Sequence, residues 1–408
     1  MEFEVSVIIL SYNRYPLNLF TLYALENQSF DLSKMEVIFI DDASSDNTSL
    51  LKEYHPPYSF KYVRNESNLG IAGTRNKGYK MAQGKIILFL DAEIIMHPDY
   101  IRNHHSHHMT NEQVVVIGKQ SEKLYSFLFP KFNSGQINDI YYLAKNRQLV
   151  EERLGKVLQQ KINKSNLQDL IKNLKEPIQL LSETEIKNST YLKSFSVSKI
   201  YLHEIFEQWE ENFNNSPLAW MACVGSNFSI KRDLIGIVGG YDESFRGWGH
   251  EDIEFSYRLY KAGTKFVFDP NLIRYHQEHP IPVEKRKEGR KNMILLQQKH
   301  PVIEVCIKSL ESIHKTDFAF MNKILQEYKS LNSEFPGRFE DFKSSIVLML
   351  QQIQILKSQE KQVSNLLQSS SNDDDSGRKE IIFSERNVIE AYGNYGNLVN
   401  LFDLLTTK

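Results

Sequence analysis

The chain has 408 residues, of which 41% are hydrophobic and 25% charged, and 49 basic against 51 acidic side chains give a formal net charge of −2. This composition is typical of a water-soluble globular protein with two or three compact units. The near-neutral balance excludes the strongly basic field that nucleic-acid binding needs, so we expect no nucleic-acid partner. Only two cysteines, Cys223 and Cys306, are present, which excludes a secreted disulfide framework.

The N-terminus leads directly into an apolar stretch, and no apolar run reaches the roughly 20 residues that a membrane-spanning helix requires. We therefore expect a cytoplasmic protein, whose only membrane contact would be peripheral, at the inner face. Basic runs at residues 285–287 and 290–291 are interpreted as solvated surface, although pyrophosphate or an anionic membrane could also meet them.

Four short apolar runs occupy the first hundred residues, at 5–10, 37–40, 61–63 and 86–90, and helical spacing follows the first three. This alternation predicts an α/β fold with a mostly parallel sheet and flanking helices. Ligands of such sheets bind beyond the carboxyl ends of the strands. The polar segments 11–14, 41–46 and 91–93 begin there, so we expect them to converge on one crevice.

Residues 104–217 are polar and rich in Lys and Asn, with helical spacing at 154–162 and 167–174. We predict a helical insertion here rather than sheet. The histidines at its start are interpreted as a polar helix surface, because their spacing fits one helix face poorly; they are His104, His105, His107 and His108.

Sheet-like sequence returns at 221–230, followed by a glycine-rich segment, a helix over 251–262 that ends at Gly263, and a strand over 266–268. Helical spacing dominates beyond 300, with an apolar seam over 339–356, a hydrophilic loop near 369–376 and a second pattern over 381–405. We predict an all-helical C-terminal domain that could also mediate self-association. The expected divisions are 1–103, 104–217, 218–298 and 299–408.

Asp91 and Glu93 directly follow a predicted strand, and two carboxylates one residue apart suit Mg²⁺ or Mn²⁺. Acid pairs at strand ends often only solvate a turn, so the position in the sheet is what favours a metal site. His276 and His279 follow the last predicted strand, and one imidazole could complete the site.

Four further groups carry chemistry. Asp42 is surplus to helix capping and could accept from a nucleobase or ribose, and Arg75 offers a fork of donors that suits a diphosphate. Glycines on both sides of Trp248 favour a movable lid. Glu251 and Asp252 open a helix, where acids are stabilised by the dipole, and Asp252 could also serve as a general base.

These segments resemble a known family. Residues 5–14, 41–48, 68–78 and 91–93 together look like the inverting glycosyltransferase family 2, with its GT-A fold. Residues 225–229, 239–243 and 247–252 resemble the C-terminal half shared by the galactosyltransferase and polypeptide N-acetylgalactosaminyltransferase groups. The resemblance covers about 4–125 and 218–282, and the polar insertion at 104–215 and the C-terminal helices have no counterpart in it.

The resemblance implies inverting transfer from a UDP-sugar, with Mn²⁺ or Mg²⁺, to a hydroxyl of a glycan, lipid-linked or peptide acceptor. It implies nucleotide-sugar-binding roles for Ser11, Tyr12, Arg14, Asp42, Arg75, Asp91 and Trp248. It implies metal binding by Asp91, Glu93 and His276. Asp252 matches the catalytic base, and Glu251 matches a contact to the donor or acceptor sugar. Glu93 departs from the usual final Asp of the metal motif, and His250 stands where relatives often carry a small residue.

Two alternatives stay open. One is a non-catalytic nucleotide- or sugar-binding protein, or a scaffold with a degenerate transferase core, although the intact carboxylates argue against degeneration. The other is a dehydrogenase, which is disfavoured because Ser-Tyr-Asn-Arg follows the first strand in place of the Gly-x-Gly-x-x-Gly turn.

Overall fold

The computed structural model describes residues 2–118, 122–198, 213, 216–224, 228–282, 284–313, 317–369 and 376–407. The chain divides into two compact units that interleave in sequence. The first unit comprises Met1–Asn214, Trp220–Ser244 and Glu251–Val283. The second comprises Asn215–Ala219, Phe245–His250 and Glu284–Lys408.

The first unit is built around a central sheet, whose described strands are in the order β12-β6-β11-β4-β1-β2-β3. All neighbours pair in parallel except β11, which is antiparallel to both of its neighbours. The strands are β1 (Val5–Ser11), β2 (Met35–Asp41), β3 (Ser59–Arg64), β4 (Ile86–Asp91), β6 (Val114–Gly118), β11 (Phe228–Lys231) and β12 (Lys265–Asp269). Strands β1, β2 and β4 are buried almost throughout, as continuous apolar runs require. The predicted fold class is confirmed.

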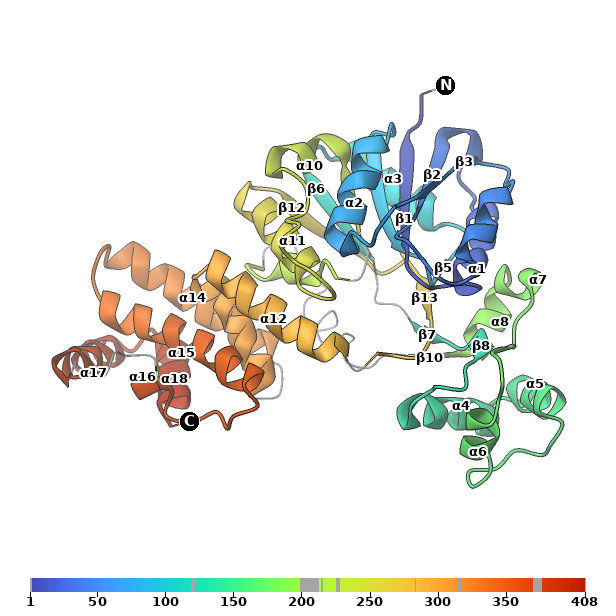
Figure 1. The fold of residues 1–408 in the computed structure, drawn as a ribbon. Helices are drawn as coiled ribbons and strands as arrows, with labels where there is room; N and C mark the ends of the chain where they lie inside the picture. Colours follow the sequence, from blue (N-terminus) through green and yellow to red (C-terminus); the bar gives the residue numbers. More distant parts are fainter. Residues whose placement is uncertain are drawn as a thin grey trace. The chain divides into compact units, whose positions relative to one another are not determined.

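Helices flank this sheet (Figure 1). They are α1 (Leu17–Glu26), α2 (Gly70–Met81), α3 (Tyr100–Thr110), α10 (Arg232–Val238) and α11 (Glu251–Lys261), with short 3-10 turns η1 (Leu32–Lys34), η2 (Asn47–Glu53) and η4 (Ala219–Ala222). Helix α2 lies close to β1, because a Cβ on Gly78 would be 2.3 Å from Cγ2 of Ile8. Helix α11 ends before Gly263, whose φ of +84° suits a helix terminus, as predicted.

A second sheet has the order β10-β7-β13-β5. Its strands are β5 (Ile94–Met96), β7 (Glu122–Leu124), β10 (Ser196–Val197) and β13 (Arg274–Gln277). Strand β13 was not predicted, and it pairs antiparallel to β5 with His276 opposite Ile94. Since Ile94 directly follows Glu93, this pairing brings the late histidines to the acidic segment after β4.

Between β7 and β10 the chain forms the helical insertion. Its elements are β8 (Phe127–Leu128), α4 (Ser134–Asn146), α5 (Gln148–Leu158), α6 (Leu167–Lys172), β9 (Ile178–Gln179), α7 (Glu183–Ile186) and α8 (Ser189–Ser194). Helices α5 and α6 confirm the helical pattern, but the prediction that 104–217 contains no sheet is wrong. Strand β6 joins the central sheet, because its run of β-branched residues is fully buried between β12 and β11.

Two histidines of α3 also contradict the polar-surface interpretation. His104 and His108 are each about 1% exposed. Nδ1 of His104 and Nε2 of His108 both lie 2.8 Å from the hydroxyl oxygen of Ser229 on β11. Burial lowers the pKa of both imidazoles, that of His108 to about 3, so the pair is neutral and joins α3 to the sheet.

The described part of the second unit is helical apart from short loops. Its helices are α12 (Glu284–Lys299), α13 (Ile303–Cys306), η5 (Ile307–Ser312), α14 (Phe318–Glu334), α15 (Glu340–Ser358), α16 (Leu366–Ser369), α17 (Ser376–Ala391) and α18 (Gly396–Thr406). The predicted seam runs along α15, where Phe342, Ile346, Met349 and Ile353 are fully buried. Residues 370–375 of the predicted loop lie outside the described residues. No helix in the described part of the chain has the length and hydrophobicity to cross a membrane.

Candidate active site

The polar segments that follow β1, β2 and β4 meet at one edge of the central sheet, as predicted. The backbone N–H of Asn13 donates to the hydroxyl of Ser44 at 3.0 Å. Nε of Arg14 donates to Oε1 of Glu93 at 3.2 Å. These bonds connect the ends of three strands, so the convergence inferred from parallel topology is confirmed.

The predicted nucleotide-binding residues after β1 differ in exposure. Ser11 is fully buried, and its hydroxyl accepts from the side-chain amide of Asn18 at 3.1 Å. Tyr12 is 47% exposed, so its ring can take a planar ligand. Arg14 is partly buried and turned toward Glu93, so it faces the acidic segment after β4.

Asp42 lies at the start of α2. It is 3% exposed, and its carboxylate accepts from the side-chain amide of Asn65 at 2.7 Å and from the backbone N–H groups of Leu69 and Gly70 at 2.8 and 3.0 Å. These bonds satisfy donors that the first turn of a helix leaves unpaired. Asp42 therefore stabilises the turn into α2, and a contact with uridine would be a second role for this side chain.

Arg75 is the centre of a buried ion-pair network. Its Nη1 donates to Oδ1 of Asp252 and lies 3.4 Å from Oε1 of Glu251, and its Nη2 lies 3.5 Å from Oδ1 of Asp91. The guanidinium also lies 5.1 Å from the ring centre of Tyr241. Burial opposes protonation, but the charge of Asp252 and the other acidic groups raises the pKa of Arg75 above its ordinary value. The guanidinium faces three carboxylates of the site, whereas we predicted a diphosphate contact.

Asp252 and Glu251 begin α11, where the helix dipole favours acids. Oδ1 of Asp252 accepts both from Arg75 and from the hydroxyl of Tyr241, the latter at 3.1 Å. Two donors on one oxygen fix the orientation of this carboxylate. Burial and the neighbouring charge of Asp252 raise the pKa of Glu251 to about 7.

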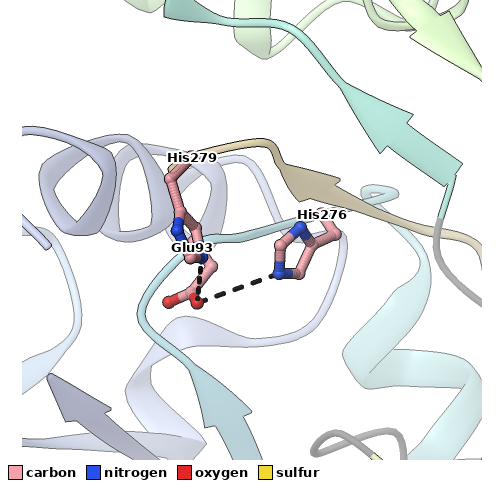
Figure 2. A group of neighbouring side chains, drawn as sticks. All are labelled: Glu93, His276 and His279. Atoms are coloured by element: carbon pink, nitrogen blue, oxygen red, sulfur yellow. Dashed lines mark hydrogen bonds and ion pairs between the residues drawn. The ribbon is translucent and has the colours of Figure 1, made fainter. Parts of the chain in front are cut away.

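A group that could hold a metal ion lies close to the acidic segment (Figure 2). One ligand atom each from Glu93, His276 and His279 lies within 4.8 Å of the others. Nε2 of His279 is 3.2 Å, and Nε2 of His276 3.8 Å, from Oε1 of Glu93. Glu93 and His276 were predicted together, and His279 joins them. Among the described residues, Asp91 is not part of this group.

The donor set fits a divalent first-row transition metal. Burial disfavours ionisation of Glu93, but the charge of Arg14 and the two imidazoles outweigh it and hold the pKa of Glu93 well below its usual value. Mg²⁺ prefers oxygen ligands alone, whereas two imidazoles and one carboxylate suit a divalent transition-metal ion, and Mn²⁺ is the one of these that also favours carboxylate and phosphate oxygens. Three protein ligands would leave coordination positions for phosphate oxygens.

The Trp248 loop, residues 245–250, belongs to the second unit and is held by α12. The backbone N–H of Trp248 donates to Oε2 of Glu288 at 2.9 Å. The side-chain amide of Asn292 donates to three carbonyls of the loop, those of Arg246, Trp248 and Gly249 at 2.9–3.3 Å. The Trp248 side chain is 48% exposed. The glycines were predicted to free this loop, yet its backbone is tied to a helix in the same unit.

Two parts of the sequence motifs remain to be placed. Gly225 to Asn227 lie outside the described residues, so only Phe228 and Ser229 of that motif are seen, on β11. Tyr241, from the quoted 239–243 run, was given no role, although its hydroxyl bonds Asp252. An aromatic residue in a glycine-rich turn is the one signal that could have singled it out.

Comparison with known proteins identifies the family. The family described as "Glycosyl transferase family 2" matches residues 6–167, and the family described as "Glycosyltransferase like family 2" matches residues 156–335. Together the two matches span most of the first unit and the start of the second. The resemblance to glycosyltransferase family 2 inferred from the motifs is confirmed.

Curated relatives agree with this assignment. The uncharacterized glycosyltransferase YfnE of Bacillus subtilis is 27% identical over 302 residues, which are 73% of this chain and 70% of YfnE. Hyaluronan synthase of Pasteurella multocida is 25% identical over 335 residues, 80% of this chain but only 30% of the synthase. The chain thus spans less than a third of that synthase.

More distant similarities were also found. Polypeptide N-acetylgalactosaminyltransferase 3 of Taeniopygia guttata is 24% identical over 68% of this chain and 39% of its own length, a weak trace of the predicted resemblance of the C-terminal half. The solved structure of S. aureus TarS 1–349 shares 13% identity with a TM-score of 0.43, over 98% of this chain and 90% of that one, too distant to add to the assignment. The family matches and the named relatives point the same way: the chain belongs to glycosyltransferase family 2, a family of sugar-transferring enzymes.

Proposed function

We propose that this chain is an inverting, Mn²⁺-assisted glycosyltransferase that moves a sugar from a UDP-sugar to a hydroxyl group of a glycan. The observation that carries the proposal is the orientation of Asp252. Its carboxylate is buried at the start of α11 and takes two hydrogen bonds on one oxygen, from Arg75 and Tyr241. A general base must be ionised and held in a fixed direction.

In the proposed reaction, Asp252 takes the proton of the acceptor hydroxyl as the hydroxyl oxygen attacks the anomeric carbon. A carbon–oxygen bond forms on one face of the sugar, the bond from carbon to the diphosphate breaks on the other, and UDP leaves. Arg75 keeps Asp252 ionised and oriented, which we favour over direct contact with the diphosphate because its guanidinium already faces three carboxylates. Glu251, next to the base, would contact a sugar hydroxyl.

The donor side consists of the segments after β1, β2 and β4. Tyr12 offers an exposed ring, and Asp42 and Arg14 lie at the same edge of the sheet. Glu93, His276 and His279 would hold Mn²⁺, which when bound neutralises charge on the departing diphosphate. The relatives named for hyaluronan and chondroitin synthesis favour a glycan as the acceptor.

The test measures UDP release from a panel of UDP-sugars with Mn²⁺, with Mg²⁺ and with a chelator, in the presence of short glycan acceptors. Asp252→Asn should bind donor within about twofold of wild type but lose about 10²–10⁴-fold in transfer rate. Asp233→Asn, an exposed acid in the first turn of α10, is the matched control and should transfer normally.

Transfer by Asp252→Asn at the wild-type rate would contradict the base assignment. Glu251→Gln separates the two neighbouring acids, since a larger loss there than in Asp252→Asn would make Glu251 the base. Donor binding with no turnover of any sugar would instead support the non-catalytic alternative.

A further inference from the structure

Glu278 is a buried carboxylate that the proposed reaction does not use. It follows β13 directly and is 6% exposed. Its Oε1 lies 3.3 Å from Nδ1 of His276, and its backbone N–H donates to the carbonyl of Leu124 on β7 at 2.7 Å. A charged side chain is costly to bury, so a carboxylate here needs a partner that gains from it. The imidazole of His276 is one such partner.

The imidazole rings of His276 and His279 have the same orientation relative to their oxygen neighbours. Each imidazole has Nδ1 beside an oxygen: His276 beside Glu278, and His279 beside the carbonyl of Pro280 at 2.9 Å. Each has Nε2 toward Oε1 of Glu93. An oxygen on Nδ1 fixes the proton there and leaves the Nε2 lone pair for a metal. The hydrogen bond with Pro280 therefore pre-sets His279 to bind through Nε2, while at His276 the Glu278 carboxylate lies at ion-pair distance from Nδ1.

Gln136 connects this arrangement to the helical insertion. It lies in the first turn of α4 and is 3% exposed. Its side-chain amide donates to Oε2 of Glu278 at 3.2 Å and to the carbonyl of His279 at 2.9 Å. Its amide oxygen accepts from the backbone N–H of Asn133, so the same side chain also closes the capping box of α4. One glutamine thus holds the start of the insertion, the carboxylate and a histidine backbone together.

We propose that Glu278 is a positioning residue for His276 in the Mn²⁺ site, and that Gln136 makes the strength of metal binding depend on the helical insertion. The proposal rests on the proposed function only in requiring that Glu93, His276 and His279 hold a metal. It gives residues 127–197, which have no counterpart in the motif resemblance, a role at the catalytic centre. A change in α4, such as contact with an acceptor, would then alter metal affinity.

The test is direct Mn²⁺ binding to the full chain, measured by electron paramagnetic resonance of free Mn²⁺ and by calorimetry, without donor or acceptor. Glu278→Gln keeps the size of the side chain but removes its charge, and Gln136→Met keeps the length but removes the amide. Each should weaken Mn²⁺ binding about tenfold or more, the usual effect of losing a group that orients a metal ligand. Gln148→Met, an exposed glutamine on α5, is the control and should bind as wild type does.

The outcomes are separable. Wild-type affinity in both Glu278→Gln and Gln136→Met would overturn the proposal while leaving the metal site intact. Weakening in Glu278→Gln alone would overturn the link to the insertion. Failure of the wild type to bind Mn²⁺ would overturn the metal part of the proposed function itself. Thermal melting of each protein without metal shows whether it is folded. If Gln136→Met is not folded, Gln136→Leu replaces it, and its Mn²⁺ affinity is compared with that of the wild type after saturation with Mn²⁺ and removal of the metal.

Discussion

The raised pKa of Glu251 predicts a specific dependence of the free energy of unfolding on pH. Burial and the charge of Asp252 raise the pKa of Glu251 from 4.5 to about 7 in the folded protein. An unfolded chain releases this proton near pH 4.5, whereas the folded protein keeps it until about pH 7. Native stability therefore falls as pH rises through that window, by about 3 kcal/mol for a displacement of this size.

Replacing Glu251 with Gln removes the effect. Glutamine resembles the protonated acid in shape, so Glu251→Gln should match the wild type at about pH 4 and below, where the carboxyl is protonated in the folded and unfolded states alike. By pH 8 the variant should be more stable by about 3 kcal/mol, because the wild type then carries an extra buried negative charge. Urea unfolding of both proteins from pH 4 to 8, with chelator present, gives the difference at each pH. Glu53→Gln, an exposed glutamate in η2, is the control.

A difference between Glu251→Gln and wild type that stays constant across this range would refute the reasoning. It would mean that Arg75 compensates the charge of Glu251 as fully as that of Asp252. A difference of the opposite sign, with the variant less stable at pH 8, would mean that the ionised carboxylate is part of the network that holds α11 to α2.

Three further outcomes follow from the described contacts. His279→Ala should weaken Mn²⁺ binding at least tenfold in calorimetry while Glu93 and the fold are retained; unchanged affinity would remove this imidazole from the site. Ser229→Ala should lower the free energy of unfolding by about 1–3 kcal/mol, because two buried imidazoles lose their shared hydroxyl; an unchanged melting temperature would count against that link. Asn292→Ala should accelerate amide hydrogen exchange at Trp248 several-fold without unfolding α12, and equal exchange would show that Glu288 alone holds the loop.

The fold could be predicted where the pattern is local. Apolar runs correctly predicted β1, β2, β3 and β4, and glycine marked the end of α11. Strand β6 was missed because residues 104–217 were judged by their average polarity, although a run of three valines and an isoleucine is a strand signal by itself. The antiparallel direction of β11 could not be predicted, since nothing in four residues encodes which way a strand enters a sheet.

The sequence identified many of the residues of the site, but it did not indicate which of them contact one another. Arg75 suited a phosphate by its chemistry, yet its partner Asp252 is 177 positions away, and only the folded sheet brings them together. His104 and His108 stand four apart, which places both on one helix face, but burial depended on Ser229 from a distant strand. Long-range partners of this kind leave no mark on the spacing of either segment.

Residues 245–250 belong to the second unit, and this matters for the design of truncated or recombined versions of these enzymes. A protein cut after residue 283 still contains Trp248, Glu251 and Asp252 in its sequence. It lacks Glu288 and Asn292, which hold the backbone of the tryptophan loop. A domain swap that exchanges the C-terminal helices for those of another family member would mismatch the same loop. Residues 245–250 and α12 should therefore be taken from the same parent protein, although 33 residues of the first unit separate them in the sequence.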